Sequence, residues 1–210
     1  YRGMAVGTAA PTVEEMEGVP HHMIGVADPW ENWSAARFTA AADACVQDIL
    51  RRGRRPILVG GTGLYLDALL RGIDFAAGSQ DTPLRRQLQE RLRREGAEAL
   101  LEELRRIDPD SAARLHLRDE KRILRALEVY QETGETITQH DRRTREQPPR
   151  YEGLFIGLNF KDRQDLRDRI DRRVDDMVAQ GLLDEVRSLL RSGLPRTATA
   201  WQAIGYKQFL

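Results

Sequence analysis

Four apolar residues run directly into a glycine-rich turn, and this junction constrains the fold more than any other feature of the sequence. Residues 56–59 predict a buried strand, Gly60-Gly61-Thr62-Gly63 predicts a tight turn, and the leucines that follow predict a helix. Upstream, residues 22–26 predict another strand, and Ser34 predicts the N-cap of a helix that ends at Gly53. Strand, helix, strand and helix in this order predict an α/β fold with a parallel sheet.

The stretch from residue 78 to residue 149 contains helix signals but no strand candidate. Asp119 can cap a helix there, and Gly134 can end it. We therefore expect an all-helical insertion at residues 78–149. The α/β core that surrounds it would be formed by residues 1–77 and 150–210.

Charge and cysteine content exclude several classes of protein. Lys and Arg number 33 and Asp and Glu number 33, so no net charge draws the chain to acidic partners. The single cysteine, Cys45, excludes an internal disulfide framework, and the four histidines lack the spacing of metal ligands. No apolar run approaches the length of a membrane span, and no signal segment opens the chain. We expect a cytoplasmic protein with no membrane contact.

The glycine turn is itself a candidate binding element. Glycines at a helix start let a ligand approach backbone N–H groups that suit an anion or a polar ligand edge, and Thr62 adds a hydroxyl. The alternative is a tight turn that merely requires glycine. The turn is not a dinucleotide fingerprint, because Leu66 holds the third glycine position. No lysine follows a glycine in this chain, so a Gly-x-x-x-x-Gly-Lys phosphate loop is excluded.

A helix that Asp162 caps, after a strand candidate at residues 154–158, contains two arginines of interest. Arg173 falls inside the apolar stripe of this helix, and Arg169 falls at its edge. The stripe consists of Leu166, Ile170, Val174 and Met177. A guanidinium that faces a core requires an anionic partner, so Arg173 either forms an internal ion pair or faces a phosphate or diphosphate.

Basic residues also gather on the insertion and at the end of the chain. Lys121, Arg122 and Arg125 form a cluster on one helix, and Arg85 lies at the start of the insertion. The alternative for each of them is an ordinary solvated helix face. Residues 201–207 combine aromatic rings, an amide and a cation, which suits stacking on unpaired bases, and aromatic core packing is the alternative there.

Together these motifs resemble those of the tRNA dimethylallyltransferase (IPP transferase) family. The resemblance rests on Tyr1-Arg2-Gly3-Met4, Gly7-Thr8-Ala9, Asp28-Pro29, residues 60–65, residues 122–129 and Ala203-Ile204-Gly205-Tyr206-Lys207. It implies a P-loop NTPase-like, nucleotide- and ATP-binding parallel sheet core whose helical insertion grips the anticodon stem-loop of tRNA. The implied reaction moves a dimethylallyl group from dimethylallyl diphosphate to the N6 amine of an adenosine beside the anticodon. It uses Mg2+ and releases diphosphate.

The same resemblance assigns roles to individual residues. It places Arg173, with Arg169, at the diphosphate, and it makes Thr62 and Arg173 catalytic, with no metal ligand in this chain. Lys121 departs from the family, which more often has Gln there, and so keeps a donor but loses an acceptor. The residues expected to contact tRNA are Thr62, Arg85, Lys121, Arg122, Ile123, Leu124, Arg125, Trp201, Gln202, Gly205, Tyr206 and Lys207.

The family pattern also sets expectations about the extent of the chain. A phosphate loop and a catalytic Asp would precede Tyr1, and further helices would follow residue 210. We expect residues 1–210 to be a fragment, inactive by itself, from a protein that acts as a monomer. Two alternatives are an adenylate isopentenyltransferase that modifies a free nucleotide and a non-catalytic RNA-binding remnant. The long basic insertion favours tRNA, because a free nucleotide needs no such grip.

Overall fold

The computed structural model describes residues 1–73, 75 and 82–210, and the chain divides into two compact units. Unit 1 consists of residues 1–66 and 153–210, and unit 2 consists of residues 67–152. Helix α2 (Gly63–Arg71) runs across the boundary between them. The sequence predicts a helical insertion at residues 78–149, so its predicted boundaries lie close to those of unit 2.

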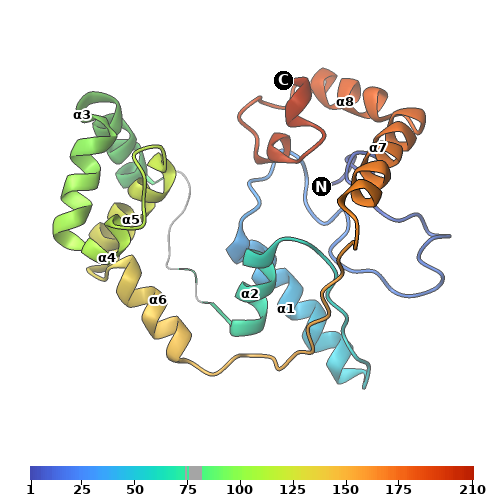
Figure 1. Ribbon diagram of the computed structural model, residues 1–210, viewed down its shortest axis with the longest axis horizontal. Coiled ribbons are helices and arrows are strands. Elements are labelled where there is room, and N and C mark those ends of the chain that lie inside the picture. The colour runs from blue at the N-terminus through green and yellow to red at the C-terminus, as the bar shows by residue number, and fades with distance from the viewer. Residues whose placement is uncertain (74, 76–81) are drawn as a thin grey trace. The chain divides into compact units, whose positions relative to one another are not determined.

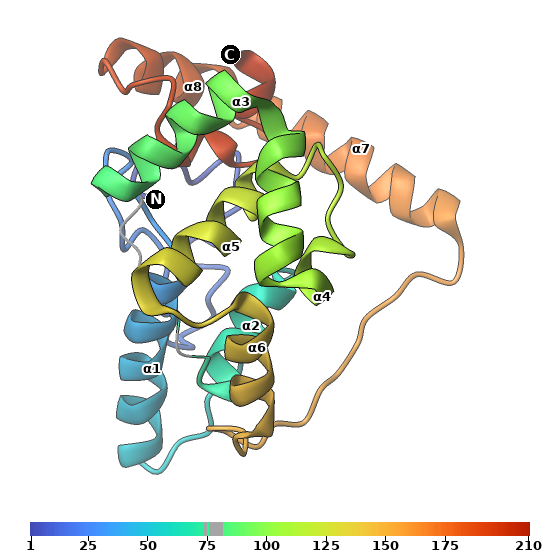
Figure 2. The same cartoon turned by 90° about the vertical axis from the view of Figure 1, so that its left-hand side faces the viewer.

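Unit 2 is built from helices whose ends follow local sequence signals (Figure 1). It contains α3 (Pro83–Ile107), α4 (Pro109–Ala112), α5 (Glu120–Thr133) and α6 (Ile137–Glu146). Thr82 caps α3 through its hydroxyl, and α5 ends at Gly134, which has a left-handed backbone at φ 73°. Gly96 has non-helical dihedral angles that interrupt α3, and Figure 2 shows that this helix is bent.

The core of unit 2 joins these helices through leucine-rich faces. Leu88, Leu100 and Leu104 of α3 lie in one buried cluster with Ile123 and Leu127 of α5. Each of these side chains is at most 1% exposed. Burial of a leucine or isoleucine contributes about 1.5–3 kcal/mol, so this cluster accounts for much of the stability of the unit.

Unit 1 contains helices that pack on each other less extensively. They are α1 (Ala35–Arg51), α7 (Arg163–Ala179) and α8 (Leu182–Arg191), followed by the short 3-10 helices η1 (Thr199–Gln202) and η2 (Lys207–Phe209). Ser34 caps α1 and Asp162 caps α7, as the sequence predicts. The described helices of the chain include none that is long and apolar enough to cross a bilayer.

The core of unit 1 brings the start of the chain against its end. Met4, Trp201 and Tyr206 are at most 1% exposed and lie in a cluster with Leu182 and Val186 of α8. A Cβ atom at Gly7 would come within 2.6 Å of the Tyr206 ring, so only glycine fits beside this buried tyrosine.

The predicted parallel sheet is absent, and the prediction of an α/β, P-loop NTPase-like core was wrong. No strand occurs in residues 1–73, 75 and 82–210, and the segments 22–26, 56–59 and 154–158 are irregular. Val59 is 91% exposed and Leu158 is 94% exposed. A strand satisfies its backbone N–H and C=O groups only through a neighbouring strand, and an apolar run does not supply that neighbour.

Candidate functional site

Helix α5 presents two different faces, and the predicted basic stretch is divided between them. Lys121 and Arg122 are exposed in the first turn, whereas Ile123 and Leu124 are 0% and 3% exposed and belong to the core. This division follows from the 100° step between helical residues. The side chains available to a ligand on this turn are therefore Lys121 and Arg122.

The position of these cations at the start of α5 is electrostatically unusual. The N-terminus of a helix carries partial positive charge, so a cation in the first turn is unfavourable and an anion there is favourable. The Asp119 side chain does not cap the helix, and its Oδ2 instead accepts a hydrogen bond from the His116 amide at 2.9 Å. Arg122 is 75% exposed, and its Nη1 lies 4.0 Å from Asp119 Oδ1. The first turn also contains the exposed carboxylate of Glu120, so Lys121 and Arg122 lie beside two acidic residues, Asp119 and Glu120.

A buried carboxylate brings together two of the predicted arginines, which lie far apart in the sequence. Glu128 Oε2 lies 3.1 Å from Arg85 Nη1 and 2.9 Å from Arg125 Nη1. The Glu128 side chain is 3% exposed, whereas those of Arg85 and Arg125 are 17% and 33% exposed. Both guanidinium groups still reach solvent, so part of each remains accessible to a ligand.

Glu128 is the residue of this cluster that sequence reasoning missed. Its other oxygen, Oε1, is buried and receives no hydrogen bond from a described residue. A usable signal was present, because Glu128 follows Leu124 by four residues and stands between Leu127 and Val129 on the apolar face of the helix. A charged residue at such a position requires a partner.

Thr62 lies exposed at the start of α2, as the glycine turn predicts. Its carbonyl oxygen accepts hydrogen bonds from Tyr65 and Leu66, and the Tyr65 ring stacks on Phe38 of α1 at 4.4 Å. Gly60, Gly61 and Gly63 do not require a left-handed backbone, and a Cβ atom at any of them would meet nothing within 4 Å. The fold of the described chain therefore does not itself require glycine here, and the turn is open to a ligand.

Helix α7 does not bury the stripe that placed Arg173 against a core. None of its residues is buried, and Ile170 and Val174 are 50% and 49% exposed. Arg169 and Arg173 are exposed, and neither forms an ion pair with a described residue. The structure therefore does not contain the internal ion pair that was the alternative for Arg173, and its guanidinium faces solvent.

The segment 201–207 separates into buried aromatic and exposed polar side chains. Trp201 and Tyr206 are fully buried, Gly205 adopts φ 96°, and Gln202 and Lys207 are exposed. The buried rings pack in the core of unit 1, which was the alternative to base stacking. Only Gln202 and Lys207 present free polar side chains.

Glu185 of α8 fixes Tyr206 and the start of the chain. Its carboxylate accepts hydrogen bonds from the backbone amides of Ala5, Val6 and Gly7 at 2.8, 3.0 and 3.1 Å, and from the Tyr206 hydroxyl. Burial and this neighbouring carboxylate raise the pKa of Tyr206 well above its ordinary value of 10.0. These bonds keep the phenol neutral and the segment rigid.

The described part of the chain contains no complete set of protein ligands for Mg2+. No three His, Cys, Asp or Glu side chains there gather closely enough to hold a metal ion. Because Mg2+ is often bound by substrate phosphates and one or two carboxylates, its participation in the reaction stays a prediction.

Comparison with known proteins decides the family. The family model described as IPP transferase matches residues 1–210. The chain belongs to the IPP transferase family. It is 49% identical to tRNA dimethylallyltransferase 1 of Pelobacter propionicus and 48% identical to that of Trichlorobacter lovleyi, over 99% and 100% of its own length. It spans 67% and 68% of those two relatives.

Solved structures of IPP transferases give the same relationship. The tRNA isopentenylpyrophosphate transferase of Bacillus halodurans matches 99% of this chain with a TM-score of 0.62 at 42% identity, and the chain covers 63% of that structure. A eukaryotic dimethylallyltransferase acting on tRNA matches the whole chain with a TM-score of 0.76 at 30% identity, and 53% of that structure is covered.

Proposed function

We propose that this protein transfers a dimethylallyl group from dimethylallyl diphosphate to the N6 amine of an adenosine beside the anticodon of tRNA. A bond forms between N6 and the terminal allylic carbon, the bond from that carbon to the diphosphate oxygen breaks, and the amine loses one proton. Diphosphate leaves with the electron pair of the broken bond. The target base must leave its stack to be reached.

The observation that carries this proposal is similarity to tRNA dimethylallyltransferases along the whole chain. Identity of 48% and 49% over at least 99% of these residues includes both units, so the relationship is not confined to one motif. Transfer to tRNA thus accounts for the helical unit as well as for the glycine turn.

In this proposal unit 2 binds the RNA. The cations available to phosphates are Lys121 and Arg122 at the start of α5 and the outer faces of Arg85 and Arg125. Each phosphate that such cations neutralise releases counterions, so tRNA binding should weaken steeply with salt. We propose that Ile123 and Leu124 support this surface from the core.

The chemistry is assigned to unit 1. We propose that Thr62 contacts the target nucleotide at the open glycine turn and that Arg173, with Arg169, binds the diphosphate. An exposed guanidinium without an ion-pair partner is free to bind a phosphate oxygen pair through its planar fork. Gln202 and Lys207 are the exposed groups of the 201–207 segment that could meet tRNA, with Trp201, Gly205 and Tyr206 holding them in place. We also propose that the protein acts as a monomer in the cytoplasm.

The test is product analysis with the full-length protein and labelled dimethylallyl diphosphate. The acceptors are a tRNA transcript with adenosine beside the anticodon, the same transcript with guanosine at that position, and adenosine monophosphate. We expect label in the first transcript only. Label in the free nucleotide would instead identify an adenylate isopentenyltransferase. Binding of tRNA without transfer would identify a non-catalytic RNA-binding protein.

A further inference from the structure

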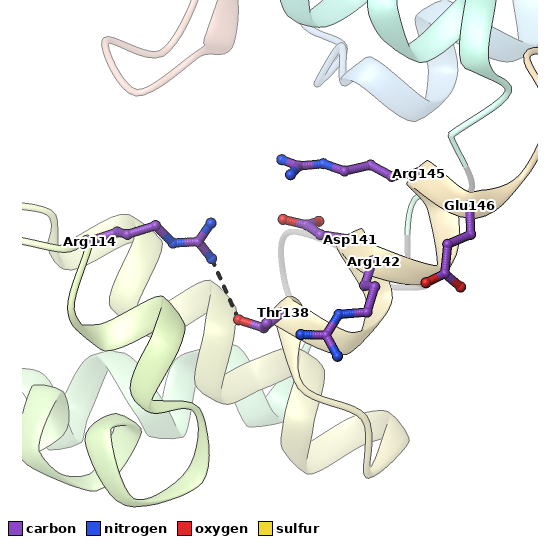
Figure 3. Close-up of a pocket in the computed structure, with 6 residues that line it drawn as sticks. All are labelled: Arg114, Thr138, Asp141, Arg142, Arg145 and Glu146. Atoms are coloured by element: carbon purple, nitrogen blue, oxygen red, sulfur yellow. Dashed lines mark hydrogen bonds between the residues drawn. The ribbon is translucent and has the colours of Figure 1, made fainter.

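A pocket of about 250 Å³ lies on unit 2, and none of the residues that line it is assigned a role above. Its walls come from α6 and from the segment that follows α4 (Figure 3). Arg114, Arg142 and Arg145 point their guanidinium groups around it, as the close-up shows. The remaining lining residues are Thr138, Asp141 and Glu146.

A buried aspartate holds the two walls of this pocket together. Asp108 is 3% exposed, and its Oδ1 caps α4 by accepting a hydrogen bond from the Ser111 amide at 3.1 Å. The same carboxylate accepts hydrogen bonds from the Thr138 hydroxyl at 2.6 Å and the Thr138 amide at 3.0 Å. These bonds fix the first turn of α6 against α4, so the arginines project from a rigid support.

Arg114 is tied to this support. Its Nε donates to the Asp110 carbonyl at 3.1 Å, and its Nη2 donates to the Thr138 hydroxyl oxygen at 3.5 Å (Figure 3). Two neutral oxygens therefore orient the guanidinium, and no carboxylate of a described residue forms an ion pair with it. An oriented, uncompensated guanidinium is a strong donor to an anion.

Arg142 and Arg145 keep their charge uncompensated although carboxylates adjoin them in the sequence. Neither forms an ion pair with a described residue. Arg143, on the same helix, behaves differently, because its Nη1 binds both oxygens of Glu135 at 2.9 and 2.8 Å. Around the pocket three guanidinium groups outnumber two carboxylates, which leaves one positive charge in excess.

We propose that this pocket binds a phosphodiester group of the RNA backbone, outside the contacts that the family resemblance assigns. The proposal rests on the proposed function, since it takes tRNA as the substrate. A volume below the 300–1,000 Å³ of typical small-molecule sites suits a backbone phosphate rather than a whole metabolite. The single excess charge matches the single charge of a phosphodiester, and guanidinium groups recognise its oxygens in pairs.

The experiment measures tRNA binding by the full-length protein at several salt concentrations. Arg142→Ala and Arg145→Ala should each weaken binding roughly two- to fivefold, as expected for an exposed ionic contact. Each should also reduce the slope of log affinity against log salt by about 0.7–0.9. Arg143→Ala is the matched control, because it removes the same charge from the same helix but from a guanidinium that Glu135 already occupies. It should leave the slope unchanged.

Two further measurements separate this proposal from its competitors. The KM for dimethylallyl diphosphate should be the same in Arg145→Ala as in the wild type. A parallel loss of affinity for inorganic diphosphate and for tRNA would show that the pocket takes a free phosphate compound and would overturn the RNA assignment. Equal salt slopes in Arg142→Ala, Arg145→Ala and Arg143→Ala would also overturn it. If the wild type transfers dimethylallyl to tRNA in that case, the proposed function stands and only the pocket assignment fails.

Discussion

The two units of this chain differ in how completely they bury their apolar residues. In unit 2, leucines of α3 and α5 bury one another within a stretch of about fifty residues, and most of the apolar face is covered. In unit 1, the core joins Met4 to α8 and Tyr206, while the apolar runs at 56–59 and 154–158 remain largely exposed. Unit 2 thus completes its packing from local sequence, and unit 1 depends on contacts between distant segments.

The difference has a physical cause. A helix satisfies its own backbone hydrogen bonds, so an amphipathic helix needs only one neighbouring apolar face. A strand needs a second strand, and closing a long loop to supply one costs entropy before any pairing is gained. The comparison predicts that substitutions in unit 2 have large and readily assigned effects, and that those in the exposed runs have small ones.

The largest effect should come from the carboxylate that Arg85 and Arg125 share. Glu128→Gln removes the buried carboxylate charge that Arg85 and Arg125 share, and we expect unit 2 to lose about 3–5 kcal/mol of unfolding free energy. Urea unfolding followed by circular dichroism measures this loss. Glu132→Gln, which removes an exposed carboxylate from the same helix, is the control and should change stability by less than about 0.5 kcal/mol. Equal effects of the two substitutions would mean that the buried cluster does not stabilise the unit.

The next effect contrasts one apolar residue from each unit. Leu127→Ala empties a position that is 0% exposed and should destabilise the 210-residue chain by about 2–5 kcal/mol. Val59→Ala trims a side chain that is 91% exposed and should change stability by less than about 0.5 kcal/mol. Both are measured by urea unfolding. A large loss for Val59→Ala would show that residues 56–59 are buried and would remove the distinction between the units.

A smaller effect is expected at the junction of the two ends of unit 1. Tyr206→Phe removes one charge-assisted hydrogen bond from Glu185, which keeps three backbone donors, so the loss should be about 1.5–3 kcal/mol. Since the pKa of Tyr206 is raised in the folded state, its contribution is complete below the pKa of the unfolded tyrosine, near 10.0, and is lost as pH rises further. Unfolding free energies measured from about pH 9 to pH 11 should fall less steeply in Tyr206→Phe than in the wild type. Identical slopes would exclude the raised pKa.

The sequence predicted the helices well because their signals are local. Ser34 and Asp162 cap the helices expected of them, and Gly134 ends α5, whereas the Asp119 side chain does not form the cap expected of it. The prediction of strands was wrong for the opposite reason, because the apolar run at 56–59 carries no information about a partner strand. The expectation that the apolar stripe of α7 is buried was wrong in the same way, since periodicity identifies an apolar face but not what covers it.

The candidate site was only partly predictable. Spacing separates Lys121 and Arg122 from the buried Ile123 and Leu124, but it does not reveal that Arg85 and Arg125 meet across 40 residues. That meeting depends on the packing of α3 on α5, which places Glu128 between them. The pocket of Arg114, Arg142 and Arg145 likewise depends on Asp108 joining α4 to α6.

The most direct test of this account is a comparison of steady-state kinetics for one variant from each unit, in the full-length protein. Arg122→Ala should raise the KM for tRNA and leave the KM for dimethylallyl diphosphate unchanged. Arg173→Ala should lower kcat and weaken the binding of dimethylallyl diphosphate, while tRNA affinity and thermal stability stay unchanged. Arg172→Ala, at an exposed neighbouring position, is the control. An equal loss of affinity for tRNA and for dimethylallyl diphosphate in both variants would contradict the assignment of RNA recognition to unit 2 and of diphosphate chemistry to unit 1.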